Sequence, residues 1–464
     1  MYRIADVAVV DPRDGSVTAH QDLRIDGGRI TGIGAAAGPD RDPATVDGRG
    51  RFVVPGFVDM HAHPLNLGDP ATELGLMLAA GITGYRQMSG TSELLRRRRQ
   101  GLLGGDERTP GLLATAGPVL TPLNAGKPGA AVAEVRRQAR DGADFVKAAL
   151  ITPEIYFVVQ AEADRLGLPV AGHLPAGIDV RAASEAGFRS IEHVGPGLGV
   201  LAGCSCHEEH LRAASSLSPI KAPPFPIPFA DRLAGKLLQR IVINPTQLTS
   251  PAALRATREA IDSFDEEKAR ALARQFAANG TWNCPTLIRV QAQQLCADPA
   301  FAADPDLRYA TAKERKAWTV AAEAFRKKFG EAQRAVFEDQ FALQLRVVKT
   351  LDEEGAPLLT GTDAVGAAWV VAGASLHDEF DLLARAGLTP LRILQTVTVD
   401  PARFLHREKE AGTVEAGKEA DLVLLDGDPT AAVAGLHTVS AVIRGGMHHD
   451  AGALTTLKEQ ATGR

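Results

Sequence analysis

The sequence predicts an α/β protein, a (β/α)8 barrel of the TIM type with a small β-sandwich domain built from both chain termini. Between about residues 56 and 405, helical segments that end in glycine alternate with short apolar strands. This repeat is typical of a parallel sheet, and the number of repeats fits a closed barrel of eight strands. Near both ends of the chain, short alternating runs separated by Gly and Asp turns favour antiparallel strands instead.

The predicted domains follow this change of pattern along the chain. Residues 1–55 and 406–464 supply the two parts of the β-sandwich, and residues 56–405 form the barrel. Two stretches, about 200–270 and 296–345, exceed what a barrel connection needs and follow the carboxyl ends of strands, where barrel enzymes place lids. Within the first, the proline-rich "SPIKAPPFPIPFADR" predicts an irregular, partly mobile loop.

The composition excludes several classes of partner. The chain has 464 residues, 45% hydrophobic and 23% charged, with a net charge of −5, which gives no reason to propose nucleic acid or an anionic membrane. No apolar run reaches the roughly 18 residues of a membrane helix, and the N-terminus lacks a signal-peptide pattern. Four cysteines are too few for a disulfide framework. We therefore expect a reduced, cytoplasmic protein that acts on a small molecule, as a homo-oligomer.

The stretch "VVPGFVDMHAHP" ends an apolar strand with His61 and His63. Residues i and i+2 of a strand point to the same side, so both imidazoles project together. At the ends of later predicted strands come Lys147, His173, His193 and Asp363. Taken alone, each has a plain structural explanation, such as a hydrogen-bonded histidine, a surface lysine or a helix N-cap. Together, at matching positions of successive units, they indicate a metal site.

Longer motifs carry a resemblance to a known family. "PGFVDMHAH" and "EAGKEADLVLLDGDP" resemble the first-strand and C-terminal signatures of the amidohydrolase superfamily. "RLGLPVAGHLPAGIDVRAASEAGFRSIEHVG" and "GASLHDEFDLLARAGLTPLRILQTVTVDPARFL" are similar to a narrower group, the imidazolonepropionase-related and prolidase-like (Xaa-Pro dipeptidase-like) metal-dependent hydrolases.

The resemblance implies a binuclear centre held by His61, His63, Lys147, His173, His193 and Asp363. It assigns the two N-terminal histidines and Asp363 to one divalent ion, His173 and His193 to the other, and a bridging role to Lys147 carboxylated by CO2. We expect zinc, with manganese or another divalent metal as an alternative. A carbamate suits this bridge because it is a bidentate anion, and burial beside cations favours the free amine that forms it.

The expected reaction is attack by a hydroxide that bridges the two metals on the carbonyl of an N-acyl amino acid or dipeptide. Asp363 would orient the hydroxide and pass its proton to the leaving group. Lactonase, esterase, cyclic-amide and phosphotriester chemistry remain alternatives on the same site. A mononuclear deaminase is a weaker rival, since Ala176 stands where those enzymes place a glutamate, and a non-catalytic scaffold would have lost ligands that are all present here.

Further candidates lie near the predicted site. His377 either polarises a substrate carbonyl or holds a substrate carboxylate, with a helix-capping histidine as the alternative, and Glu379 could support it. Arg289 could pair with a substrate carboxylate or be an ordinary surface arginine.

The stretch "CSCHEEH" contains Cys204, Cys206, His207 and His210, which could form a separate zinc knuckle. Structural zinc sites usually draw paired ligands from two separated turns, and no second pair is near in sequence, so a loop beside the active-site mouth is the favoured interpretation.

Overall fold

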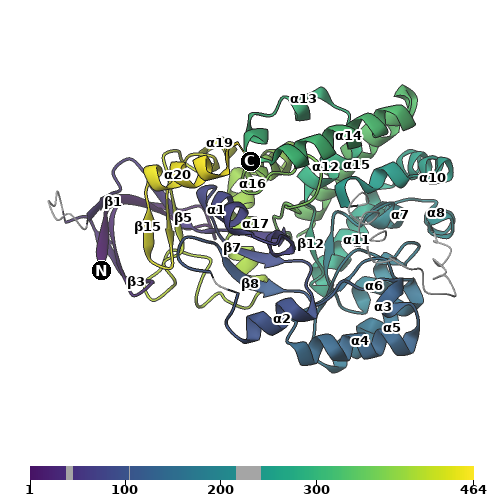
Figure 1. The fold of residues 1–464 in the computed structure, drawn as a ribbon, viewed down its shortest axis with the longest axis horizontal. Coiled ribbons are helices and arrows are strands. Elements are labelled where there is room, and N and C mark those ends of the chain that lie inside the picture. Colours follow the sequence, from purple (N-terminus) through teal and green to yellow (C-terminus); the bar gives the residue numbers. More distant parts are fainter. Residues whose placement is uncertain (38–44, 104, 216–241, 464) are drawn as a thin grey trace.

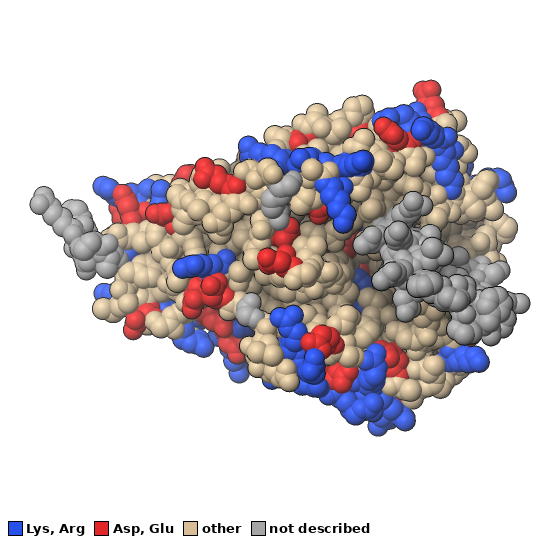
Figure 2. Space-filling model, viewed as in Figure 1, with Lys and Arg blue, Asp and Glu red and all other residues tan. Residues whose placement is uncertain are grey.

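The computed structural model describes residues 1–37, 45–103, 105–215 and 242–463 (Figure 1). The proline-rich segment predicted to be an irregular loop lies outside these residues. In the part of the chain that is described, no helix combines the length and the apolar character needed to cross a membrane. On the face drawn in Figure 2, basic and acidic side chains lie among one another, without a field of one sign.

Both ends of the chain contribute to one eight-stranded sheet. Its strands are β1 (Tyr2–Val10), β2 (Val17–Asp26), β3 (Arg29–Ala35), β4 (Thr45–Asp47), β5 (Phe52–Pro55), β13 (Leu422–Leu425), β14 (Val439–Arg444) and β15 (Met447–His449). The order is β15-β14-β13-β5-β1-β2-β3, with β4 paired to β1. The two ends meet where β5 and β13 pair antiparallel, Val53 opposite Leu424, and both side chains are buried in the core of this sheet.

The middle of the chain forms parallel strands in two groups. The first sheet holds β6 (Phe57–Ala62), β7 (Ile82–Gln87) and β8 (Gly111–Thr115). The second holds β9 (Val146–Ala148), β10 (Val170–Gly172), β11 (Phe188–Glu192) and β12 (Trp282–Cys284). All neighbouring strands in both groups are parallel, so the carboxyl ends of neighbouring strands lie at the same edge of their sheet. The fold is therefore α/β with parallel sheets.

Isolated contacts join these two groups to one another. A parallel bridge links Ala116, just after β8, to Phe145, just before β9. The segment 357–364 bridges β12 through Leu358 and β6 through Ala364, and the Met60 amide donates to the Thr360 carbonyl at 2.9 Å. This segment thus lies hydrogen-bonded between the last strand of one group and the first strand of the other.

Helices connect and cover the parallel strands (Figure 1). They are α1 (Ala71–Ala79), α2 (Ser92–Arg99), α3 (Pro122–Ala125), α4 (Pro128–Asp141), α5 (Pro153–Arg165), α6 (Val180–Glu185), α7 (Gly199–Gly203), α8 (Glu208–Ser215), α10 (Pro251–Asp262), α11 (Glu266–Asn279), α12 (Leu287–Gln294), α13 (Pro299–Ala302), α14 (Ala312–Lys328), α15 (Glu331–Glu353), α16 (Ala374–Ala386), α17 (Pro390–Val397), α18 (Val399–Phe404), α19 (Val433–Leu436) and α20 (Ala451–Ala461). Short 3-10 turns occur at Pro64–Asn66, Pro245–Leu248 and Pro305–Tyr309. As the glycine pattern predicts, α4 and α11 end at Gly142 and Gly280 in the left-handed conformation.

The helices of the two long stretches predicted as lids pack on one another. α10 lies against both α8 and α15. Figure 1 shows α7, α8 and α10 at the end of the molecule opposite the sheet formed by the two chain ends. The C-terminal helix α20 packs on α1 and so joins the terminal sheet to the parallel strands.

Candidate metal centre

The six side chains predicted as ligands lie together at the carboxyl ends of the parallel strands. The Asp363 carboxylate oxygen Oδ1 is 3.1 Å from Nε2 of His61 and 3.0 Å from Nε2 of His63. The Lys147 amine lies 3.2 Å from Nε2 of His61. These contacts bring residues that are up to 302 positions apart in the sequence into one cluster.

The two remaining histidines complete the cluster. The rings of His173 and His193 have centroids 5.1 Å apart, and the His193 ring is 4.6 Å from that of His61. One ligand atom each of His61, His193 and Asp363 lie within 4.8 Å of one another, a spacing at which one ion can contact all three. The structure therefore brings all six predicted residues together.

The backbone that carries these ligands is strained. His193 and Asp363 have φ of 60° and 62°, and Thr286, at the start of α12, has φ of 44°. Such left-handed conformations are uncommon in residues other than glycine and cluster at functional sites. Backbone bonds hold two of them, from the His193 amide to the Cys284 carbonyl at 3.0 Å and from the Asp363 amide to the His61 carbonyl at 2.7 Å. The strand ends are thus turned so that these side chains face the cluster.

Gly361, two residues before Asp363, is required by close packing. A Cβ atom at this position would lie 2.6 Å from the Cβ of His61 and 2.8 Å from the Cys284 sulfur. Real Cβ atoms essentially never approach that closely, so any larger residue would displace His61 from its strand. The glycine in "LLTGTD" therefore sets the distance between Asp363 and the first histidine.

Burial lowers the pKa of three cluster histidines and so favours their neutral form. It lowers the pKa of His63 to about 4, the pKa of His173 to about 3 and the pKa of His193 well below its ordinary value. Burial alone would raise the Asp363 pKa, but His61 and His193 hold it well below its usual range. Neutral imidazoles and an ionised carboxylate are the forms that bind a metal.

Lys147 is buried among these groups. Burial lowers its pKa, and within the described ranges no carboxylate forms an ion pair with it. These surroundings favour the uncharged form of the lysine amine, which is the form that reacts with CO2. Four imidazoles and a carboxylate are donors that suit zinc, so the residues present fit a divalent metal.

A fully buried ion network, which the sequence analysis missed, orients His61. The Glu192 carboxylate accepts from Nδ1 of His61 at 2.7 Å, and Arg86 donates to the other Glu192 oxygen at 2.8 Å. Burial by itself would raise the Glu192 pKa, but Arg86 and His61 lower it to about 2. Since Nδ1 is bound to this carboxylate, Nε2 of His61 is left to face the cluster. The available signal was a charged residue inside each of the apolar strands β7 and β11.

Two hydroxyl groups orient His63 and His193 in the same way, each through a contact with Nδ1. Nδ1 of His63 lies 2.8 Å from the Ser89 hydroxyl, and Nδ1 of His193 lies 2.5 Å from the Thr286 hydroxyl. Three histidines of the cluster therefore have Nδ1 fixed by a group outside it. Such outer partners set the tautomer and ring orientation of metal-binding histidines.

Arg289 also belongs to this site, which corrects the surface alternative. It is only 5% exposed, and its Nε donates to Oδ2 of Asp363 at 3.0 Å. Its remaining nitrogens donate to the carbonyls of Val242 at 2.6 Å and Ile243 at 3.2 Å. Because these donors are already engaged, Arg289 holds Asp363 and does not offer a free guanidinium to a substrate carboxylate.

His377 is engaged by groups other than the six cluster residues, and its contact with substrate stays a prediction. Its Nε2 donates to the Ala80 carbonyl at 2.9 Å, and its ring packs on Phe57 and Phe380. Phe57 begins β6, whereas His61 lies near the other end of that strand and His63 directly follows it. The sequence could not show this because the direction of a side chain on α16 depends on how the helix packs.

Glu379, on the same helix, supports the site indirectly. Its carboxyl oxygen accepts a hydrogen bond from the Ile288 amide at 2.7 Å. Ile288 lies in the first turn of α12, and the side chain of the N-cap residue, Thr286, makes no capping hydrogen bond there. Burial raises the Glu379 pKa to about 8. Glu379 thus fixes the start of α12, the helix that contains Arg289 and is preceded by Thr286, and these two residues contact Asp363 and His193.

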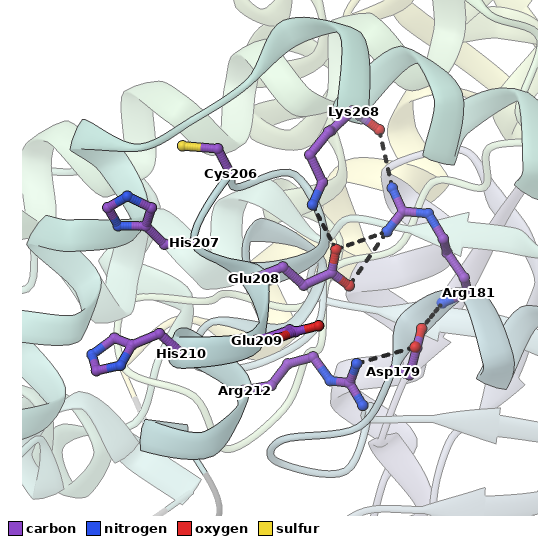
Figure 3. Close-up of a pocket in the computed structure, with 9 residues that line it drawn as sticks. All are labelled: Asp179, Arg181, Cys206, His207, Glu208, Glu209, His210, Arg212 and Lys268. Atoms are coloured by element: carbon purple, nitrogen blue, oxygen red, sulfur yellow. Dashed lines mark hydrogen bonds and ion pairs between the residues drawn. The ribbon is translucent and has the colours of Figure 1, made fainter.

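The predicted cysteine and histidine group lies elsewhere. Cys206, His207 and His210 line a surface cavity of about 630 Å³ together with charged residues, and none of the six cluster residues lines it (Figure 3). Cys204 is buried, and burial raises its thiol pKa to about 12. Of the two cysteines, only Cys206 lines this cavity.

Comparison with known proteins finds an amidohydrolase domain and structures of similar fold. Residues 344–447 match the model of the amidohydrolase family. A bottromycin amidohydrolase is similar over 99% of this chain and 90% of its own, with 25% identity and a TM-score of 0.71. The matched domain and this neighbour support the amidohydrolase superfamily for the chain.

The amidohydrolase domain and the hydrolase neighbour indicate an enzyme that hydrolyses carbon–nitrogen bonds. Two further structures share the fold. A Xaa-Pro dipeptidase with bound methionine is 19% identical, with 97% of this chain and 99% of that chain covered and a TM-score of 0.60. A prolidase in complex with N-methylphosphonate-L-proline is 17% identical, with 97% and 99% covered and a TM-score of 0.62. No curated protein matches the sequence.

Proposed function

We propose that this amidohydrolase is a binuclear metal-dependent hydrolase of an amide bond in an N-acyl amino acid or a dipeptide. The observation that carries the proposal is the orientation of three cluster histidines, since His61, His63 and His193 each have Nδ1 fixed by a group outside the cluster. Histidines are arranged in this way where the other ring nitrogen binds a metal.

The proposed fold around the site is a closed (β/α)8 barrel. Strands β6 to β12 provide seven of the eight barrel strands. The segment 357–364 takes the place of the eighth, since it is hydrogen-bonded to β12 on one side and to β6 on the other. The bridge between Ala116 and Phe145 joins the two sheets at the remaining seam. In a barrel of this kind, the carboxyl edge that carries the cluster is where catalysis takes place.

The proposed ligand sets are those that the resemblance to the amidohydrolase superfamily implies. His61, His63 and Asp363 would hold one ion, and His173 and His193 the other, with carboxylated Lys147 between them. When bound, two divalent ions, which we take to be zinc, would supply a hydroxide nucleophile at neutral pH and polarise the scissile carbonyl.

Asp363 carries the proton transfer in this proposal. Its Oδ1 faces two histidines, and its Oδ2 is held by Arg289 at 3.0 Å, so the carboxylate has a fixed direction. An ionised carboxylate in that position can take a proton from the attacking water and return it to the leaving amine. Arg289 acts through Asp363 by restraining its rotation.

The proposed substrate class rests on the structural neighbours. Two of them are named for hydrolysis next to proline, and a third for an amide bond in bottromycin. An amide with a carboxylate-bearing leaving group is common to the first two. Activated esters and lactones are the alternative, because the same site chemistry accepts other carbonyls.

The test is hydrolysis by the zinc- or manganese-loaded enzyme of a panel of N-acyl amino acids, dipeptides with C-terminal proline, and lactones, with Asp363→Ala as the control. The proposal expects amide turnover that the control lacks. Turnover of lactones without any amide would assign the site to the ester class instead. A protein that contains no metal and cleaves no member of the panel would overturn the hydrolase mechanism.

A further inference from the structure

Two neighbouring polar residues at the end of β7, Arg86 and Gln87, each connect to a different histidine of the cluster. Arg86 donates to the Glu192 carboxylate that accepts from His61. Gln87 is fully buried, and its amide lies among the residues that follow His63. A buried amide needs partners for its oxygen and for both hydrogens of its nitrogen, so the partners of Gln87 show what it does.

Two backbone groups fix the orientation of the Gln87 amide. Its oxygen accepts from the Leu65 amide at 3.2 Å, and its nitrogen donates to the Ser89 carbonyl at 2.9 Å. A backbone N–H can only donate and a carbonyl can only accept, so turning the side-chain amide over would break both bonds. The same nitrogen donates its second hydrogen to the Asn66 side-chain oxygen at 3.2 Å. Gln87 therefore presents a donor, and not an acceptor, to Asn66.

The direction of the remaining hydrogen bonds follows from this donor. The Asn66 oxygen that faces Gln87 also lies 2.9 Å from the Ser89 hydroxyl. An amide oxygen cannot donate, so the hydroxyl gives its one proton to Asn66. The same hydroxyl lies 2.8 Å from Nδ1 of His63 and can then only accept from it. Nδ1 of His63 therefore carries the proton, and Nε2 is left with a lone pair.

This tautomer places two acceptors face to face inside the cluster. Nε2 of His63 is 3.0 Å from Oδ1 of Asp363. Without a proton between them, a nitrogen lone pair and an ionised carboxylate repel one another at this distance. A divalent cation bound to both atoms removes the repulsion, because neutral imidazole and carboxylate are the forms that ligate it. The chain of hydrogen bonds from Gln87 thus favours the metal-bound form of the site over the metal-free form.

We infer that Gln87 is a positioning residue for His63, because it holds the ring in the tautomer that binds a divalent ion. It acts through Asn66 and Ser89. Leu65 and Asn66 belong to the 3-10 turn that starts directly after His63, so this one turn contacts both the oxygen and the nitrogen of the buried amide. The inference rests on the proposed metal function of the cluster and adds to it the residues that prepare this ligand.

The experiment measures the zinc affinity of the full-length protein by competition with a chromogenic chelator. Wild-type protein should bind about two zinc ions. Ser89→Ala, at a partly buried position, should weaken the binding of one ion about 10- to 100-fold, the usual loss when an outer partner of a metal-binding histidine is removed. Ser89→Thr keeps the hydroxyl and should retain most of the affinity. Wild-type protein that binds no zinc would overturn the proposed function together with this inference, whereas undiminished affinity in Ser89→Ala would overturn the inference alone.

Two variants that each add one carboxylate separate the direction of the hydrogen bonds from electrostatics. Asn66→Asp keeps an acceptor for both of its partners and should match or exceed the wild-type affinity. Gln87→Glu, measured at about pH 8.5 and so well above the ordinary glutamate pKa of about 4.3, removes the donor. Asn66 then turns its nitrogen toward the new carboxylate and toward Ser89, whose hydroxyl donates to His63 instead.

The zinc affinity of Gln87→Glu should therefore fall about 10- to 100-fold, although the added negative charge attracts cations. Equal affinities in Asn66→Asp and Gln87→Glu would overturn the inference. If Gln87→Glu does not fold, the pair of Ser89 variants decides the question.

Discussion

Replacing Arg289 with methionine should impair catalysis by freeing Asp363 to rotate. The guanidinium is 5% exposed and donates to Oδ2 of Asp363 at 3.0 Å, so the lost contact is a buried hydrogen bond between charged groups. Such bonds contribute about 1.5–3 kcal/mol, which corresponds to roughly a 10- to 100-fold loss in kcat/KM. The loss should be larger for amides than for activated esters, because a poor leaving group depends more on the proton that Asp363 carries.

Steady-state kinetics on an amide and an ester of the same acyl group, with metal content measured in parallel, would test this prediction. Arg315→Met is the matched control, since that guanidinium also donates to backbone carbonyls, those of Leu307 and Ala310, without contacting a cluster residue. Arg289→Lys should rescue little, because one ammonium cannot reach Asp363 and both carbonyls. Wild-type kcat/KM for the amide in Arg289→Met would refute the positioning role.

Three further changes probe the cluster and its support. Lys147→Ala should lose most turnover and metal, with partial recovery in added short carboxylic acids; near-normal turnover and metal content would show that the bridging role is wrong. Asp363→Asn should keep much of the metal but lose about 10²–10⁴-fold in rate, and an equal loss for amides and activated esters would exclude the proton shuttle. Burial raises the Glu379 pKa to about 8, so the folded chain keeps a proton that the unfolded chain releases near pH 4.3, and stability should fall as pH rises from about 5 to 8. Denaturant unfolding should show a smaller decline in Glu379→Gln, and an identical decline would contradict the assigned pKa.

The cluster of six could be predicted because it depends on one rule of parallel sheets. Residues that follow successive strands meet at one edge, so His61, Lys147 and Asp363 converge although the sequence separates them widely. His377 and Arg289 follow no such rule. Each lies on a helix after a strand, and its direction depends on how that helix packs, which residue types alone do not reveal.

Charged residues inside apolar strands gave a weaker signal. Arg86 in β7 and Glu192 in β11 had to be paired because both are fully buried, but the sequence does not show which charges meet. Their partner proved to be His61, so the pair orients a cluster histidine. The fold class followed from the helix-then-strand repeat, whereas these buried contacts required three-dimensional coordinates.

The most direct test of the central claim is anomalous diffraction at the zinc absorption edge from crystals grown with zinc. The account predicts two peaks inside the cluster, one beside His61, His63 and Asp363 and the other beside His173 and His193, with electron density for a carboxylated Lys147 between them. A cluster without an anomalous peak, in crystals of protein that still hydrolyses an amide, would contradict the account.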